Sequence, residues 1–408
     1  MKDKKQTIPE IFVKDYTYIL PEEKIARYPN SERDHSKLLV YDRGISEHIF
    51  SSLPEFVPSG SVLVFNNSKV IRARIFFKKV TGASIEVFCL YPGVPSTFDE
   101  SLSSIRYCSW WCAVGNAKKW KDDLLEKELD YEGKKYSLKA RKVDIKNDYL
   151  IMFEWDAPID FSKVLDCCGN IPIPPYLKRD SEQVDEFSYQ TVYSKLEGSV
   201  AAPTAGLHFT ERVLNSLKNK GIDFEEITLH VGAGTFKPIK EVLAHKHEMH
   251  KETFIINRST LEHLRDKTGD VIAVGTTSAR MLESLYWLGV IADDNDDYSL
   301  SQWEAYQHDT DMSAKEAFTR LLNKMDHQKT VSEHATTEIM IAPGYKFRTI
   351  SGLITNFHQP ESTLILLVAA FIGEKWREVY NYALDHDFRF LSYGDCSLLI
   401  ERDVPKIE

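Results

Sequence analysis

The sequence predicts an α/β main domain that is interrupted by an inserted small antiparallel β-barrel domain. Residues 61–155 hold consecutive period-two segments without helix signals, namely SVLVFNN, RARIFFKKV, SIEVFCLY, CSWWCAVG, KYSLKARKV and DYLIMFEW. Short strands in succession, separated by Gly, Asn and Asp turns, are typical of a small barrel or sandwich. After residue 155, strand-like and helix-like segments alternate, as in α/β layers. We therefore expect a barrel at 58–155 and a discontinuous catalytic domain from 1–57 and 156–408.

The helices of the main domain are predicted by their caps and apolar spacing. FSKVLDCCG ends at a glycine, and TERVLNSLKNKG has a Thr cap, apolar residues every three to four positions and a glycine stop. STLEHLRDKTG, TTSARMLESLYWLG and STLILLVAAFIG are read as further helices, and EEITLHV, MHKETFIIN and VIAVG as strands. Residues 291–337, with the acidic turn ADDNDDYS and an amphipathic SAKEAFTRLLNKMD, are expected to form an inserted excursion, more mobile than its surroundings.

Composition bounds the class of protein. The 408 residues are 43% hydrophobic and 27% charged, which suits two globular domains. No segment reaches the roughly 18 apolar residues of a membrane span, and the N-terminal residues lack an apolar signal core. The six cysteines form no CxxC pair. We expect a cytoplasmic protein with reduced thiols, no membrane partner, and a monomeric or weakly homo-oligomeric state.

Charge is unevenly distributed along the chain. The net charge is −10, yet residues 61–155 carry 16 Lys and Arg against 12 Asp and Glu. A mildly basic module on an acidic body can meet a polyanion locally, although a solvated strand surface would show the same bias.

GTTSAR at 275–280 follows the buried strand VIAVG and opens a helix. The free N–H groups and the dipole of such a helix start attract a carboxylate or phosphate. Arg280, one turn later, can bind such a group in a bidentate manner. Thr276 and Thr277 are thus candidate ligand-binding residues, with an ordinary Thr/Ser cap as the alternative.

Two loops of small residues each carry a single histidine. SVAAPTAGLHFT at 199–210 contains His208, and LHVGAGTF at 229–236 contains His230. Gly and Ala allow close approach of the backbone to a ligand, and imidazoles titrate near neutral pH. Both loops are therefore candidate catalytic segments, although a core histidine held by the backbone would look the same.

HKHEMHKE at 245–252 raises the question of a metal site. His and Glu are good zinc ligands, but no second cluster with metal spacing accompanies them. We favour no metal, and a strand that places His250 and Glu252 on one face as acid/base or hydrogen-bonding partners. A plain surface strand is the alternative.

Other catalytic motifs are absent from the sequence. It has no G-x-x-x-x-G-K-[ST] loop, no G-x-G-x-x-G after a strand and no G-x-S-x-G. These absences disfavour P-loop nucleotide triphosphatases, Rossmann dehydrogenases and α/β-hydrolases.

Eleven segments, in order from residue 15 to residue 395, resemble the S-adenosylmethionine:tRNA ribosyltransferase-isomerase family of queuosine synthesis. They are DYTYILPEEKIARYP, SVLVFNNSKVIRAR, IPIPPY, YQTVY, SVAAPTAGLHF, TLHVGAGTFKP, MHKE, AVGTTSARMLES, APGYKF, LITNFHQPESTL and RFLSYGD. Two features depart from the family pattern. Arg72 stands where the family usually has proline, and residues 291–337 are some thirty residues longer than expected.

The resemblance implies the same fold and a specific reaction. The ribosyl part of S-adenosylmethionine would be transferred to aminomethyl-deazaguanine at the tRNA wobble position and isomerised, giving epoxyqueuosine with release of adenine and methionine. S-adenosylmethionine would be a consumed substrate, so no cofactor is expected. A paralogous transferase with another amine acceptor, or a catalytically silent tRNA-binding protein, are the alternatives.

The resemblance places the motif residues in the site without giving each its role. We expect His208 or His230 to transfer protons with Glu252 or Asp395 as partner, Thr276, Thr277 and Arg280 to hold the methionine carboxylate, and Phe209 or Phe357 to stack on adenine. Further substrate-binding candidates are Thr204, Gly232, Gly234, Thr235, His250, Asn356, His358 and Tyr393. The candidate tRNA-phosphate contacts are Lys69, Arg72, Arg74, Lys78 and Lys79.

Overall fold

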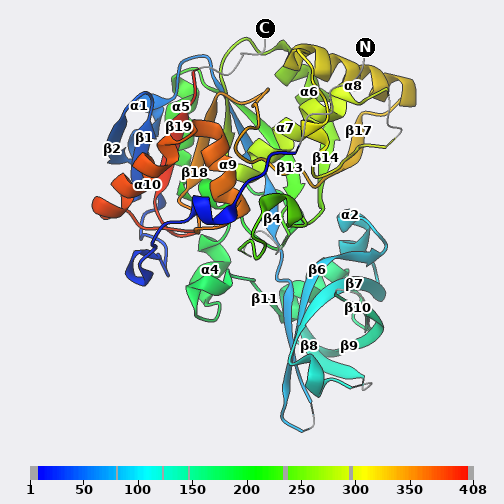
Figure 1. Ribbon diagram of the computed structural model, residues 1–408. Coiled ribbons are helices and arrows are strands. Elements are labelled where there is room, and N and C mark those ends of the chain that lie inside the picture. Colours follow the sequence, from blue (N-terminus) through cyan, green and yellow to red (C-terminus); the bar gives the residue numbers. More distant parts are fainter. Residues whose placement is uncertain are drawn as a thin grey trace.

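A ten-stranded mixed sheet forms the body of the molecule (Figure 1). The computed structural model describes residues 8–79, 81–121, 124–145, 148–232, 238–293 and 297–402. The strand order is β16-β17-β14-β13-β3-β15-β18-β19-β1-β2. The strands are β1 (Lys37–Tyr41), β2 (Ile45–Ile49), β3 (Val62–Asn66), β13 (Asp223–His230), β14 (Glu252–Asn257), β15 (Val271–Val274), β16 (Ser299–Leu300), β17 (Ser332–Thr337), β18 (Gly352–Asn356) and β19 (Cys396–Ile400). The central strands β13, β3, β15 and β18 are parallel, so their carboxyl ends lie at one edge, where α/β sheets bind ligands.

Helices cover both faces of this sheet. The helices are α1 (Leu53–Phe56), α5 (Glu211–Asn219), α6 (Arg258–Asp266), α7 (Thr276–Val290), α8 (Ala314–Gln328), α9 (Thr363–Ile372) and α10 (Lys375–Asp385). Alternate residues of β3 enter separate cores, because successive side chains of a strand point to opposite faces. Leu63 and Phe65 pack with α1 and α5, whereas Val62 and Val64 belong to the core of α6 to α10. The predicted α/β architecture is confirmed.

A second, antiparallel sheet lies beside the main sheet, at the lower right of Figure 1. Its order is β11-β5-β6-β7-β10-β9-β8. The strands are β5 (Arg74–Lys78), β6 (Ser84–Val94), β7 (Tyr107–Gly115), β8 (Leu125–Tyr131), β9 (Lys134–Ile145), β10 (Tyr149–Trp155) and β11 (Gly169–Asn170). The sheet curls into a half-barrel, and Lys127 of β8 donates to the Phe76 carbonyl of β5 at 3.0 Å. Its own apolar core includes Trp110, Phe153 and Phe161.

One predicted barrel strand belongs to the main sheet instead. SVLVFNN forms β3, which pairs in parallel with β13 and β15. All five residues of β3 are buried, as expected for a parallel strand covered on both faces. The period-two reading cannot separate such a strand from a barrel strand that follows directly. After β3, the short strand β4 (Ser68–Val70) pairs with β12 (Leu196–Ser199) and leads into the curled sheet.

Residues 291–337 do not form a separate excursion, contrary to expectation. In their described part, 291–293 and 297–337, β16 and β17 extend the main sheet and α8 packs on α7. A Cβ on Gly289 of α7 would lie 2.2 Å from the Ala317 carbonyl oxygen of α8, so the two helices cross at close range. Phe318, Leu321 and Met325 of α8 are fully buried. Polar residues of α8 such as Lys315, Glu316 and Asn323 form its solvent face.

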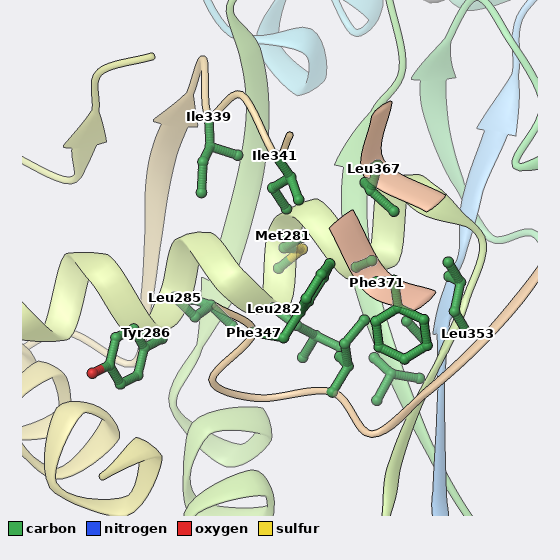
Figure 2. Packing of buried hydrophobic residues seen from close by; sticks show 14 of the residues in the cluster. Met281, Leu282, Leu285, Tyr286, Ile339, Ile341, Phe347, Leu353, Leu367 and Phe371 are labelled. Carbon is green, nitrogen blue, oxygen red and sulfur yellow. The ribbon is translucent and has the colours of Figure 1, made fainter. Parts of the chain in front are cut away.

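The predicted helices are otherwise confirmed, and α7 is the most deeply buried. Thr277 alone among its fifteen residues is not buried. Figure 2 shows Met281, Leu282 and Leu285 of this helix packed among Ile341, Leu353 and Phe371 from three other segments. Polar side chains of α7 are hydrogen-bonded inside the core, since Ser278 donates to the Val274 carbonyl, Arg280 donates to Glu252, and Glu283 accepts from Thr349. No helix in the described part of the chain has the length and apolar content needed to cross a bilayer.

Candidate active site

Six of the sequence motifs contribute to one pocket at the carboxyl edge of the central strands. The pocket encloses about 670 Å³ of space, including the part open to solvent. Its walls come from Ala201 to Ala205, from Gly275 to Thr277, from Thr355 to Gln359 and from Leu391 with Ser392. Tyr176, Val231, Ser362 and Leu364 complete it. We call it the central pocket. Its lining polar groups are hydroxyls, amides and one imidazole, that of His358, without a charged side chain.

The start of α7 forms one wall of this pocket. Gly275, at φ +92°, precedes the helix, and no side chain caps its first turn. The Ser278 hydroxyl instead donates back to the Val274 carbonyl at 2.8 Å. Thr276 and Thr277 therefore present uncapped N–H groups and hydroxyls toward the pocket, which is an arrangement suited to an anion.

Arg280 and Glu252 form a buried ion pair one turn further along α7. Arg280 Nη1 donates to Glu252 Oε2 at 2.6 Å, and both side chains are more than nine-tenths buried. The Nε and Nη2 atoms of Arg280 have no hydrogen-bond partner among the described residues. Neither residue of the pair is among those that line the central pocket, and Arg280 keeps two unused donors one turn beyond the α7 start.

His208 is engaged at both ring nitrogens. Its Nδ1 lies 2.7 Å from Ser36 Oγ, and its Nε2 lies 3.1 Å from Asn356 Nδ2. Burial, and then the positive charge of Arg389, lowers the pKa of His208 to about 3. The ring is thus neutral near pH 7, and it lines a second, smaller pocket with Arg33, Arg389 and Tyr393. Asn356 connects His208 to the central pocket.

His358 is the histidine whose ring lines the central pocket. Its Nε2 lies 2.8 Å from Thr355 Oγ1, and its backbone carbonyl accepts a hydrogen bond from Tyr18. Burial lowers the pKa of His358 to about 3. The ring is therefore neutral near pH 7 and able to accept a proton only where the transition state drives the transfer.

His230 faces the curled sheet rather than the central pocket. Val231, the next residue, lines the pocket, whereas the His230 ring stacks on Phe98 of α2 (Phe98–Leu102) with centroids 4.3 Å apart. A Cβ on Gly198 would lie 2.5 Å from His230 Nδ1, so only glycine fits there. Burial lowers the pKa of His230 to about 4. The two predicted catalytic histidines are therefore not in one pocket.

Two of the sequence-predicted residues, Phe209 and Asp395, are held by contacts within the protein. Phe209 is completely buried among Phe50, Phe65 and Tyr193, so it is not available to stack on adenine. Asp395 accepts hydrogen bonds from the backbone N–H groups of Lys37 and Arg389, and its burial raises its pKa.

Two further residues lie apart from the central pocket. Tyr393 donates to Asp185 at 2.7 Å. His250 is exposed and precedes β14, whereas Glu252 is buried in β14, so the prediction that one strand places both side chains on the same face is wrong.

Thr204 lines the central pocket, and Gly232 lies just beyond Val231. Gly234 and Thr235 lie outside the described residues.

The five candidate phosphate contacts spread over a strip from β4 to the end of β5. Lys69 pairs with Glu197 and Arg72 with Glu186, both at 2.9 Å, and all four residues line one pocket. Arg74 pairs with Glu86 at 3.1 Å. Lys79 donates to the Lys119 carbonyl at 3.1 Å, and Lys78 is exposed. Carboxylates thus accompany three of the five cations.

Sequence reasoning missed three parts of the site. Tyr176 and Ser392, hydrogen-bonded to each other, line the central pocket, and both stand in motifs that were recognised without a role. Ser36, which orients His208, lies in a segment without any pattern. Phe98, the partner of His230, comes from α2, between two strands of the curled sheet, and is foreseeable only from the fold.

Comparisons with known proteins agree with these motifs. The family model described as "Queuosine biosynthesis protein" matches residues 13–399. Proteins named S-adenosylmethionine:tRNA ribosyltransferase-isomerase are similar along nearly their whole length. The one from Francisella tularensis subsp. novicida is 38% identical over 94% of this chain and 98% of its own, and the one from Trichlorobacter lovleyi is 36% identical over 96% and 100%.

Among solved structures, the crystal structure of S-adenosylmethionine tRNA ribosyltransferase from Thermotoga maritima is similar. It is 26% identical, with a TM-score of 0.45, over 95% of this chain and 100% of that one. On the family model and the curated relatives, the chain belongs to the queuosine biosynthesis protein family, the family of the S-adenosylmethionine:tRNA ribosyltransferase-isomerases.

Proposed function

We propose that the protein transfers the ribosyl moiety of S-adenosylmethionine to aminomethyl-deazaguanine at the tRNA wobble position and isomerises it. The products are epoxyqueuosine in the tRNA, free adenine and free methionine. The observation that carries the proposal is the meeting of six family motifs in the central pocket, in a chain matched by the family model from residue 13 to residue 399. The protein is expected to act in the cytoplasm.

The methionine carboxylate belongs at the start of α7 in this proposal. Uncapped first-turn amides and the Thr276 and Thr277 hydroxyls line the pocket there. Arg280 adds a buried cation with two unused donors one turn away. A charge-assisted contact of this kind would orient the sulfonium and ribose toward the motif loops.

Proton transfer is assigned to imidazole groups near the ribose. The reaction needs a base for the proton on the ribose carbon beside the sulfonium, and an acid for the departing adenine. His358 lines the pocket and is neutral, so we place it nearest the reacting atoms. His208 is bonded at both nitrogens and fits a positioning role better than the proton transfer expected from sequence.

Tyr176 and Phe357 are the aromatic residues that line the same pocket. Phe357 is 1% exposed and packs on Tyr380, Phe388 and Phe390, so we place Tyr176, which is half-buried, against adenine.

The experiment is incubation of the protein with S-adenosylmethionine labelled in its ribose and with tRNA bearing the deazaguanine. Label should enter the tRNA and adenine should appear in equal amount. The Thr277→Val variant, which removes a hydroxyl at the uncapped helix start, should lower the apparent affinity for S-adenosylmethionine. Lys346→Ala, an exposed lysine outside the central pocket, is the matched control.

Label that enters another amine but not this tRNA would replace the proposal with a paralogous transferase. A folded protein that binds tRNA without releasing adenine would point to a silent tRNA-binding protein.

A further inference from the structure

In Asn356, the last residue of β18, the amide nitrogen has three hydrogen-bonding partners, whereas the amide oxygen has none among the described residues. It is 2% exposed and lines the central pocket. Its Nδ2 lies 3.1 Å from His208 Nε2, 3.2 Å from the Leu391 carbonyl and 3.4 Å from the Asp395 carbonyl. Its Oδ1 is buried and has no hydrogen-bond partner among the described residues. Buried acceptors are rarely left unpaired, so this oxygen calls for a donor that the protein itself does not supply.

The orientation of this amide is fixed by its surroundings. Two of the three atoms around Nδ2 are main-chain carbonyl oxygens, which can only accept hydrogen bonds. A flipped amide would place Oδ1 against both of them and leave its N–H groups unpaired. The nitrogen must therefore face Leu391 and Asp395, so the oxygen is the amide atom of Asn356 that is left for a ligand of the central pocket, which this residue lines.

The tautomer of His208 supports the same orientation of the Asn356 amide. The Ser36 hydroxyl donates to the Arg33 carbonyl at 3.2 Å, so its oxygen is free to accept the Nδ1–H of His208. A proton on Nδ1 leaves Nε2 of the neutral ring as an acceptor for the Asn356 amide. Asn356 Nδ2 thus donates to His208 Nε2, and His208 Nδ1 donates to Ser36 Oγ. Of the amide atoms of Asn356, only Oδ1 is left without a partner among the described residues.

We propose that Asn356 Oδ1 accepts a hydrogen bond from the nucleoside part of S-adenosylmethionine, and that His208 is the positioning residue that holds the amide for it. The donor is an uncharged N–H or O–H, either the exocyclic amine of the adenine or a ribose hydroxyl. The uncharged hydroxyl and amide lining of the pocket matches such a group. This inference rests on the proposed function, because it takes S-adenosylmethionine as the ligand.

The test is calorimetric binding, without tRNA, of S-adenosylmethionine and three analogues. The analogues carry hypoxanthine in place of adenine, or lack the 2′- or the 3′-hydroxyl. Hypoxanthine replaces the exocyclic amine with an oxygen, which would face Asn356 Oδ1 as a second acceptor. We expect one analogue to bind at least about tenfold more weakly than S-adenosylmethionine, and its identity names the donor. Equal binding of all four would overturn the inference and leave the proposed function intact, whereas no binding of S-adenosylmethionine would overturn both.

Variants of Asn356 and His208 then test whether these two residues cause the difference in affinity between S-adenosylmethionine and the weaker-binding analogue. Asn356→Ala should bind S-adenosylmethionine and the discriminated analogue with affinities within about threefold of each other. His208→Leu removes the acceptor for the amide nitrogen and should reduce the discrimination, whereas His208→Gln, which offers an oxygen near the place of Nε2, should retain most of it. A merely structural role of His208 would predict the same discrimination in both His208 variants.

The matched control is Asn66→Ala, a buried asparagine of β3 whose amide bonds only to the protein. It should keep the full discrimination, and melting curves should show which variants are folded. Full discrimination in a folded Asn356→Ala would overturn the assignment, and so would its persistence in His208→Leu.

Discussion

At the residue scale, the buried ion pair of Arg280 and Glu252 dominates the site's electrostatics. Replacing Glu252 by Gln leaves the Arg280 guanidinium buried without its counter-charge, which costs about 3–5 kcal/mol of unfolding free energy. Urea unfolding at pH 7 measures this cost. The double variant Glu252→Gln with Arg280→Met should recover much of it, because the uncompensated charge is gone. A single variant as stable as the wild type would show that water reaches the pair.

The buried histidines make stability fall with acidification. The pKa values of His208 and His358 are lowered to about 3, and that of His230 to about 4, by burial. Below pH 6.5 the unfolded chain binds a proton at each imidazole and the folded chain does not. Each histidine therefore removes about 1.4 kcal/mol per pH unit of unfolding free energy well below pH 6.5, down to its folded pKa.

The histidine prediction is checked with His358→Gln. The stability deficit of this variant relative to wild type should shrink by about 1–2 kcal/mol between pH 6.5 and pH 5. His327→Gln, on the exposed face of α8, should show no such change. A deficit for His358→Gln that is independent of pH would mean that the imidazole is solvated in the folded protein.

Residue types and spacing locate the motifs but not the orientation of single side chains. GTTSAR and TNFHQP could be predicted as parts of one site from the family resemblance, and they lie at the carboxyl ends of β15 and β18. That His208 and His230 diverge could not be predicted, because each direction depends on partners distant in sequence, namely Ser36 and Phe98. Phe209 likewise looks like a site residue from its motif and is a core residue by its packing.

At the scale of elements, the crossing of α7 and α8 tests whether residues 297–337 belong to the core. Gly289→Ala puts a Cβ 2.2 Å from the Ala317 carbonyl oxygen, so backbone must move, and we expect a loss of about 1–3 kcal/mol. Gly44→Ala is the control, since a Cβ there meets nothing within 4 Å. Thermal unfolding of both variants measures the difference. If Gly289→Ala were as stable as Gly44→Ala, α8 would be only loosely attached to α7.

Elements with a strong local signal were predictable, and those defined by their neighbours were not. The Thr210 side chain caps α5, and Gly169 ends α3 (Phe161–Cys168), as the sequence indicates. β3 was read into the wrong sheet because a strand buried on both faces and a barrel strand share the same residue types. The sequence showed that α8 is amphipathic but not that its apolar residues Phe318, Leu321 and Met325 pack in the core that contains α7, because that depends on a neighbouring element.

At the scale of the whole molecule, an acidic protein must offer tRNA a local basic surface. The net charge is −10, and the candidate contacts Lys69 and Arg72 are already paired with Glu197 and Glu186. Binding of tRNA should weaken steeply with salt, because phosphate contacts release counterions. Filter binding from 50 to 200 mM salt measures the slope of log affinity against log salt.

The paired carboxylates allow a sharper version of the salt prediction. Lys78→Ala should reduce that slope by about one unit, and Glu186→Gln should tighten tRNA binding by freeing Arg72. Lys375→Ala, on α10 of the main body, is the control. An affinity that does not change with salt would contradict a role for this strip.

The central claim is that S-adenosylmethionine binds in the pocket where the α7 start meets the β18 loop. The most direct measurement is a crystal structure of the complex with S-adenosylmethionine. The account predicts the methionine carboxylate at the Thr276 and Thr277 amides and the nucleoside beside Asn356 and His358. A ligand seated instead against His230 and Phe98, or between Lys69 and Arg72, would contradict it.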